Sequence, residues 1–251
     1  MVTPPDLVLL HTSPVHVPVF DALRDRHHPE AVLRHLVEPE LLERARAEGP
    51  PAVAPALRAV LAASGPAPVL VTCSTIGATA ESLAPELGVP VLRVDRPMAA
   101  AAVRTGARIA VLAALESTLA PTAELLADEA GAGGRRVSVR PHLVAGAWEC
   151  FEAGDTDGYL ARVAAAADAV TGADVIVLAQ ASMAGAADLT TSPLPVLSSP
   201  APGLAAGLRM CPAAGPRWGA YAAPSRETEQ YGTKRRADAA AGPGAQPVPR
   251  S

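Results

Sequence analysis

Short apolar runs that recur between stretches of helical composition constrain the fold of this chain more than any other feature. Runs of this kind are typical of strands that are buried on both faces of a parallel sheet. We predict strands at residues 7–10, 31–37, 69–71, 91–94, 109–112, 137–139 and 174–178. Because helical stretches separate these strands, the sequence predicts a parallel α/β architecture.

The order of the segments is duplicated within the chain. DLVLLHTSP resembles RIAVLAALE, and VTCSTIGATAE resembles LAQASMAGAAD, which makes Gln180 the counterpart of Cys73. The duplication predicts two similar halves with a cleft between them. Ligands of open α/β sheets bind at the carboxyl ends of the strands. We therefore expect the segments that contain His11, Cys73, Ala113 and Gln180 to face a single site.

Cys73 lies between a predicted strand and the first turn of a predicted helix. Backbone N–H groups in a first turn lack intrahelical partners, and the helix dipole there stabilises an anion such as a thiolate. A cysteine at a strand end is also often an inert buried residue. The pattern alone therefore leaves a catalytic and a structural role open.

Composition excludes several classes of mechanism. Lys234 is the only lysine and asparagine is absent, which excludes a Schiff-base or phosphate-loop lysine in the body and a Cys-His-Asn triad. The formal charge of −4 gives no footprint for nucleic acid or an anionic membrane. Three widely spaced cysteines fit neither a disulfide framework nor a zinc site, and no signal peptide or membrane span is expected. We expect a cytoplasmic protein.

The composition changes abruptly near residue 209. Residues 209–251 are rich in proline, glycine and alanine and have no hydrophobic period. We expect this tail to be disordered, or to be the aberrant product of a frameshift.

Six motifs carry a resemblance to a known family, and they cover about residues 7–208. In chain order they are LLHTSPVHVPVF, HLVEPELLERA, VTCSTIGA, VLRVDRPMAAAAV, RIAVLAALESTLAPT and ADVIVLAQASMAGAA. The chain resembles the aspartate/glutamate/hydantoin racemase superfamily, whose relatives include arylmalonate decarboxylases and maleate isomerases. The resemblance implies two pseudo-symmetric parallel-sheet α/β halves with the active site in the cleft between them. The first half is expected at residues 1–96 with a contribution from about 195–208, and the second at residues 97–194.

The resemblance implies acid/base chemistry at the α-carbon of a small carboxylate, as in amino-acid racemases, with no cofactor and no metal. Cys73 matches the first catalytic cysteine of the family. Substrate contacts are expected from the two residues that follow it, from a hydroxyl in the second half, from the counterpart of the cysteine and from the first strand end: Ser74, Thr75, Thr118, Gln180 and His11. His11 is alternatively a structural histidine that forms hydrogen bonds.

The second catalytic cysteine of the family is missing, because Gln180 holds its place; Cys150 and Cys211 lie outside that motif. Glutamine transfers no proton near neutral pH, although it can donate hydrogen bonds to an oxyanion. The primary hypothesis is an isomerase of the racemase type. A one-cysteine decarboxylase or cis–trans isomerase, and a non-catalytic carboxylate binder, stay open as alternatives. The expected partner is a small carboxylate, and a homo-oligomer is compatible with the sequence.

Overall fold

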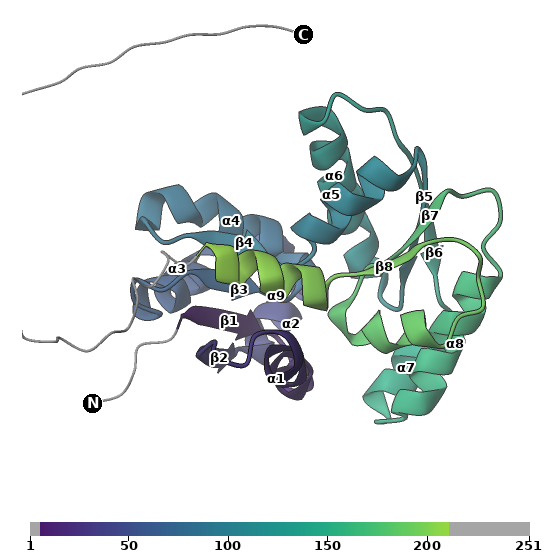
Figure 1. Cartoon of the computed structure of the whole chain (residues 1–251). Helices are drawn as coiled ribbons and strands as arrows, with labels where there is room; N and C mark the ends of the chain where they lie inside the picture. Colours follow the sequence, from purple (N-terminus) through teal and green to yellow (C-terminus); the bar gives the residue numbers. More distant parts are fainter. Residues whose placement is uncertain (1–5, 211–251) are drawn as a thin grey trace, which may run out of the picture. The chain divides into compact units, whose positions relative to one another are not determined.

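The computed structural model describes residues 6–210, which belong to one unit. Within this range the chain forms two four-stranded parallel sheets, one before and one after residue 100 (Figure 1). The strand order is β2-β1-β3-β4 in the first sheet and β6-β5-β7-β8 in the second. The two orders are equivalent, which confirms the predicted α/β class and the duplicated topology.

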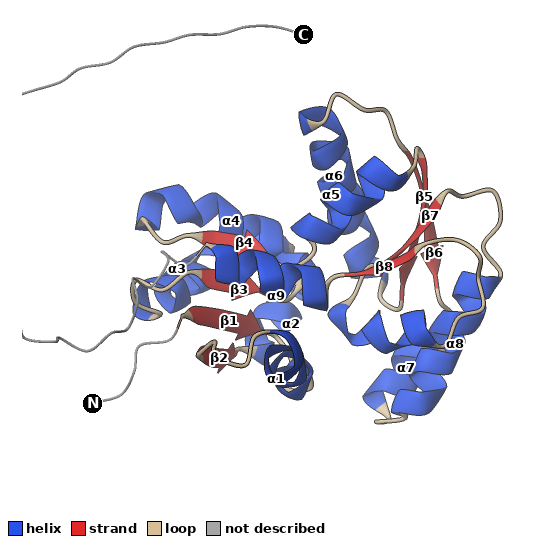
Figure 2. Cartoon of the chain, viewed as in Figure 1, coloured by secondary structure: helices blue, strands red, loops and turns tan. Residues whose placement is uncertain are grey.

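Strands and helices alternate through the first half of the chain (Figure 2). In chain order they are β1 (Leu7–His11), α1 (His16–His27), β2 (Leu33–Val37), α2 (Pro39–Glu48), the 3-10 helix η1 (Pro50–Val53), α3 (Ala54–Ala63), β3 (Val69–Val71), α4 (Ser74–Leu87), β4 (Val91–Arg93) and α5 (Arg96–Thr105).

The second half repeats the alternation. Its elements are β5 (Arg108–Ala113), α6 (Glu116–Ala132), β6 (Ser138–Leu143), α7 (Ala147–Glu152), α8 (Thr156–Asp168), β7 (Val175–Leu178), the 3-10 helix η2 (Ala181–Asp188), β8 (Val196–Ser198) and α9 (Pro200–Arg209).

The central strands are buried on both faces because alternate side chains enter two different cores. In β1, Val8 and Leu10 belong to a core that includes residues of α2, α3 and α4. Leu7 and Leu9 belong to another core, with Phe20 of α1 and residues of α9. The second sheet follows the same rule: odd-numbered residues of β5 pack with α5 and α6, and even-numbered ones with α7, α8 and η2.

The segment 195–208 does not contribute to the first half as a whole. β8 pairs with β7 and therefore completes the second sheet. Only α9 reaches the first core, where Leu204 packs with Leu7 and Leu9. Gly203 permits this close approach, since a Cβ there would lie 2.5 Å from the carbonyl oxygen of Val94. The expected domain bounds otherwise stay a prediction.

Two helical segments differ from their predicted form. The helix expected at residues 53–63 starts at Ala54 and follows the short 3-10 helix η1, in which Pro50 and Pro51 provide no N–H donors. The segment after Gln180, expected to start a helix, forms a 3-10 helix. The tail predicted to be disordered or aberrant lies, from residue 211 onward, outside the described residues.

Candidate active site

A pocket lies where the segments that follow the central strands of both sheets meet. It has a cavity volume of about 60 Å³. Its lining includes five of the six predicted site residues: Cys73, Ser74, Thr75, Thr118 and Gln180. Side chains from both sheets therefore share one pocket, as the duplication predicted.

Cys73 and Gln180 hold equivalent positions in the two halves. Cys73 lies two residues beyond the end of β3 and is the N-cap residue of α4, with φ −107° and ψ 117°. Gln180 lies two residues beyond the end of β7 and is the N-cap residue of η2, with φ −119° and ψ 140°. The backbone thus presents a thiol on one side of the pocket and an amide on the other.

The thiol of Cys73 lies at the start of a long helix. Cys73 is 8% exposed and is not part of a disulfide. The Cys73 side chain does not cap the first turn of α4, which leaves backbone N–H groups of that turn for an anion. An anion bound at this turn would lie beside the sulfur of Cys73.

The orientation of the Gln180 amide follows from its hydrogen bonds. Its Oε1 accepts from the backbone N–H groups of Ala114 and Leu115 at 2.6 and 3.3 Å. Because these are backbone donors, the oxygen must face them, which leaves the Nε2 group as the donor that Gln180 can offer to the pocket.

The hydroxyl of Ser74 forms a hydrogen bond between the segments that follow the two sheets, so its proton is not free to be donated to a substrate. Its Oγ donates to the carbonyl oxygen of Ala179 at 2.9 Å, across 105 residues of sequence. Thr75 and Thr118 are 5% and 3% exposed and line the pocket. Their hydroxyls add hydrogen-bonding groups to the lining.

His11 does not line the pocket, so the predicted substrate contact is not supported by this geometry. Thr72 Oγ1 donates to the carbonyl of Leu10 at 3.1 Å and must therefore accept from His11 Nδ1 at 2.8 Å. His11 Nε2 is then left to accept from His35 Nδ1, also at 2.8 Å. Burial, with the neighbouring His16 and His35, lowers the pKa of His11 to about 3. His11 is a neutral structural histidine.

His16 is the pocket histidine that the sequence did not single out. It lies at the start of α1 and lines the pocket, and its buried Nδ1 has no hydrogen-bond partner within residues 6–210. Burial lowers the pKa of His16 to about 4, so its ring is neutral at pH 7. Its place in the motif LLHTSPVHVPVF, directly after β1, is the sequence signal that could have identified it.

An apolar wall was also missed. Trp148 and Phe151 of α7 line the pocket with their rings stacked at a centroid distance of 4.9 Å. Leu42 of α2 and Leu115 are further apolar lining residues. Nothing in the helical pattern of residues 146–170 distinguished side chains that face a pocket from those that face the core.

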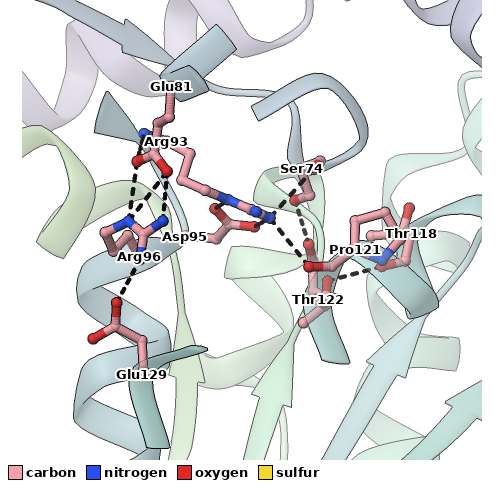
Figure 3. A network of polar contacts seen from close by, with 10 residues as sticks. Ser74, Glu81, Arg93, Asp95, Arg96, Thr118, Pro121, Thr122 and Glu129 are labelled. Carbon is pink, nitrogen blue, oxygen red and sulfur yellow. Dashed lines mark hydrogen bonds and ion pairs between the residues drawn. The ribbon is translucent and has the colours of Figure 1, made fainter. Parts of the chain in front are cut away.

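A network of arginine contacts includes the backbone of the pocket residue Ser74 (Figure 3). Arg93, at the end of β4, donates to both carboxylate oxygens of Asp95 at 2.7 and 2.9 Å. It also donates to the carbonyls of Ser74 and Pro121 at 3.4 Å. Arg93 therefore connects the first turn of α4, which follows Cys73, to the helix α6 that carries Thr118.

Within residues 6–210, no group of three or more His, Cys, Asp or Glu side chains is arranged to hold a metal ion. None of the helices in the described part of the chain is long and apolar enough to cross a membrane.

Comparisons with known proteins agree with this architecture. Residues 16–206 match the family model described as Asp/Glu/Hydantoin racemase. No curated protein matched the chain. Among solved structures, a glutamate racemase isoform from Bacillus anthracis superposes with a TM-score of 0.60 at 16% identity, covering 82% of this chain and 81% of that one. The Picrophilus torridus aspartate racemase gives 0.59 at 16% identity, with coverage of 82% and 93%.

A variant of arylmalonate decarboxylase gives a TM-score of 0.51 at 17% identity, with coverage of 85% and 94%. At these identities the structural likeness shows the fold alone, whereas the family model spans most of the chain. The chain belongs to the Asp/Glu/hydantoin racemase family.

Proposed function

We propose that this protein is an acid/base enzyme that needs no cofactor and acts at the α-carbon of a small carboxylate, with Cys73 as the proton carrier. One observation carries the proposal: a thiol and an amide occupy equivalent strand ends on the two sides of one pocket. The family membership supports the reaction class.

The proposed mechanism separates the roles of the two sides. The thiolate of Cys73 removes the α-proton, and the electron pair of the C–H bond moves into the carboxylate to form an enediolate. Backbone N–H groups of α4 and the Nε2 of Gln180 donate to its oxygens. The thiol then returns a proton to the same face, because Gln180 has no proton to supply from the other.

The same asymmetry favours decarboxylation as a second candidate. Loss of carbon dioxide breaks a C–C bond and leaves its electron pair in an enediolate without the help of a base. A single acid, the Cys73 thiol, then protonates the α-carbon, and solvent restores the thiol. Such a reaction needs one thiol, and the described lining of the pocket contains one, that of Cys73.

Proton exchange in heavy water tests the proposal. The protein is incubated with a panel of substituted acetic, malonic and amino acids, and α-deuteration and carbon dioxide release are followed by NMR. Cys73→Ser is expected to lower the rate at least ~100-fold, the usual size of an acid/base contribution. Cys150→Ser is the matched control and is expected to leave the rate unchanged, since Cys150 does not line the pocket. Equal rates for wild type and Cys73→Ser would contradict the proposal.

A further inference from the structure

A continuous chain of side-chain hydrogen bonds runs from the surface to the wall of the pocket. Oδ1 of Asp21, in α1, lies 3.4 Å from Nε2 of His35, and Nδ1 of His35 lies 2.8 Å from Nε2 of His11. Nδ1 of His11 lies 2.8 Å from Oγ1 of Thr72, the lining residue directly before Cys73. The Asp21 side chain is 38% exposed, whereas His11 and Thr72 are buried. A proton gained or lost at the outer end can therefore affect a group in the pocket.

The protons of His35 follow from its two partners. Because His11 accepts at Nε2, His35 must donate from Nδ1. Nε2 of His35 faces the carboxylate of Asp21, and a carboxylate only accepts. Both nitrogens of His35 therefore carry a proton in this arrangement. Its charge lies between a carboxylate, which Arg24 also contacts at 3.1 Å, and a neutral imidazole.

Loss of one proton from His35 reverses the direction of the chain. A neutral His35 keeps its proton on Nε2, beside the carboxylate, and accepts at Nδ1. His11 must then donate from Nε2 and accept at Nδ1, so Thr72 becomes the donor to His11. The carbonyl of Leu10 loses the Thr72 hydroxyl but keeps the backbone N–H of Thr72, at 2.9 Å. Every member of the chain thus stays paired in both arrangements.

His11 transmits this change without becoming charged. Burial, with the neighbouring His16 and His35, lowers the pKa of His11 to about 3. Its ring therefore responds by changing which nitrogen carries the proton. The titratable and charged groups around the two rings are His16, Asp21 and Arg24, all on α1.

We propose that Asp21 and His35 are positioning residues, which act through His11 on the hydroxyl of Thr72. While His35 carries both protons, the Thr72 proton is not taken up by His11 and can turn from the Leu10 carbonyl to an oxyanion or thiolate in the pocket. Once His35 is neutral, Thr72 donates to His11 and offers the pocket only an acceptor. The catalytic consequence rests on the proposed function, whereas the reversal of the hydrogen bonds does not.

NMR of the ring nitrogens tests the reversal directly. Long-range proton–nitrogen correlations of the six histidines are recorded in the ¹⁵N-labelled full chain from about pH 5 to about pH 9. His35→Gln identifies the signals of that ring. We expect His11 to change from the Nδ1–H to the Nε2–H tautomer at the pH at which His35 loses a proton. If His11 keeps one tautomer, or His35 one protonation state, over this range, the proposal is overturned.

Two variants test the role of the outer carboxylate. Asp21→Asn removes the nearest opposite charge from His35, so the tautomer change of His11 should move to a pH lower by at least ~0.5 unit. Asp25→Asn is the matched control, because Asp25 also accepts from Arg24, at 2.7 Å, but is not the carboxylate that faces His35. It should leave the change where wild type has it. An equal shift in both variants would contradict the role of Asp21.

The pH dependence of exchange tests the role of the Thr72 hydroxyl. Thr72→Val keeps the shape of the side chain, so the ratio of the wild-type rate to the variant rate isolates the hydroxyl. This ratio should fall at least ~10-fold across the tautomer change, since the pocket loses one donor. Thr72→Ser retains the hydroxyl and should keep the pH dependence of wild type. A ratio that is constant with pH would overturn the positioning role.

The outcomes separate this proposal from the proposed function. Cys73-dependent exchange in a protein whose His11 keeps a single tautomer would overturn the positioning role and leave the proposed function intact. A tautomer change without Cys73-dependent exchange or decarboxylation of any acid in the panel would support the reversal of the chain and contradict the proposed function.

Discussion

Cys73 and Gln180 have similar backbone conformations but side chains of different chemistry. Cys73 and Gln180 have similar φ and ψ values at equivalent strand ends, so a side chain of either kind starts from the same geometry. Gln180 has turned its oxygen toward the backbone of Ala114 and Leu115, where it stabilises the loop before α6. The amide thereby has a structural role at the strand end equivalent to that of Cys73.

Gln180→Cys should supply the missing proton donor. With thiols at both strand ends, protons can be removed from one face and returned to the other, so the variant is expected to racemise substrates that the wild type deuterates without inversion. Loss of the two hydrogen bonds to Oε1 should lower the free energy of unfolding by about 1–3 kcal/mol.

Chiral chromatography of the recovered acid measures the effect. Gln180→Ala removes the same hydrogen bonds without adding sulfur and is the matched control. If Gln180→Cys and Gln180→Ala give the same enantiomeric composition, residues 73 and 180 do not face opposite sides of the α-carbon, and this interpretation is wrong.

At the scale of secondary-structure elements, two arginines tie α4 to α6. Arg93 is 2% exposed and contacts the carbonyls of Ser74 and Pro121. Arg96, at the start of α5, pairs with Glu81 of α4 and Glu129 of α6 (Figure 3). These contacts fix the helix that starts beside Cys73 against the helix that begins beside Thr118.

Arg93→Met should be strongly destabilising, because it leaves the carboxylate of Asp95 buried without a partner. Removal of one partner from a buried pair typically costs about 3–5 kcal/mol. The double variant Arg93→Met/Asp95→Leu removes both charges and should recover most of that loss. Urea denaturation of both proteins measures the free energies of unfolding.

Arg58 is the matched control for this prediction. Its guanidinium pairs with Glu86 through two hydrogen bonds of 2.7 and 2.9 Å, but the two side chains are 43% and 54% exposed. Arg58→Met should therefore lower the free energy of unfolding far less than Arg93→Met does. If Arg93→Met were as stable as Arg58→Met, Arg93 would not be the partner that stabilises the buried carboxylate of Asp95. Arg93 can pack closely against α4 because residue 77 is a glycine. A Cβ at that position would lie 2.9 Å from the Cβ of Arg93.

At the scale of the whole molecule, buried neutral histidines make folding depend on pH. The pKa of His11 is lowered to about 3 and that of His16 to about 4, both chiefly by burial. In the unfolded chain both have ordinary values near 6.5. Between these values the unfolded state binds more protons than the folded state, so stability rises with pH. The stabilisation is fully present above about pH 6.5 and is lost as the pH falls toward 4.

The free energy of unfolding should therefore fall between pH 7 and pH 5. One histidine with its pKa lowered from 6.5 to 4 accounts for about 2 kcal/mol over this interval. Urea denaturation at pH 7, 6 and 5 measures the slope. His16→Gln, which cannot be protonated, should show a smaller slope than wild type. The same slope in both proteins would show that His16 does not titrate as its burial requires.

Much of the fold could be predicted because its signals are local. Runs such as residues 69–71 and 109–112 identify buried strands, and the repeated order identifies two equivalent sheets. The same register makes Cys73 and Gln180 counterparts on sequence grounds alone. The position of β8 could not be predicted, because its pairing with β7 rather than with the first sheet depends on long-range hydrogen bonds.

The sequence by itself determined the α/β class, the duplication and the pairing of Cys73 with Gln180 as counterparts, since periodicity, order and residue identity are properties of the chain. Only the tertiary structure decided which side chains are free to act. In the tertiary structure the Ser74 hydroxyl donates to the carbonyl of Ala179, His11 lies outside the pocket lining, and His16 and Trp148 line the pocket. The physical reason is that each polar group binds the nearest available partner, and the nearest partner of Ser74 lies 105 residues away in sequence.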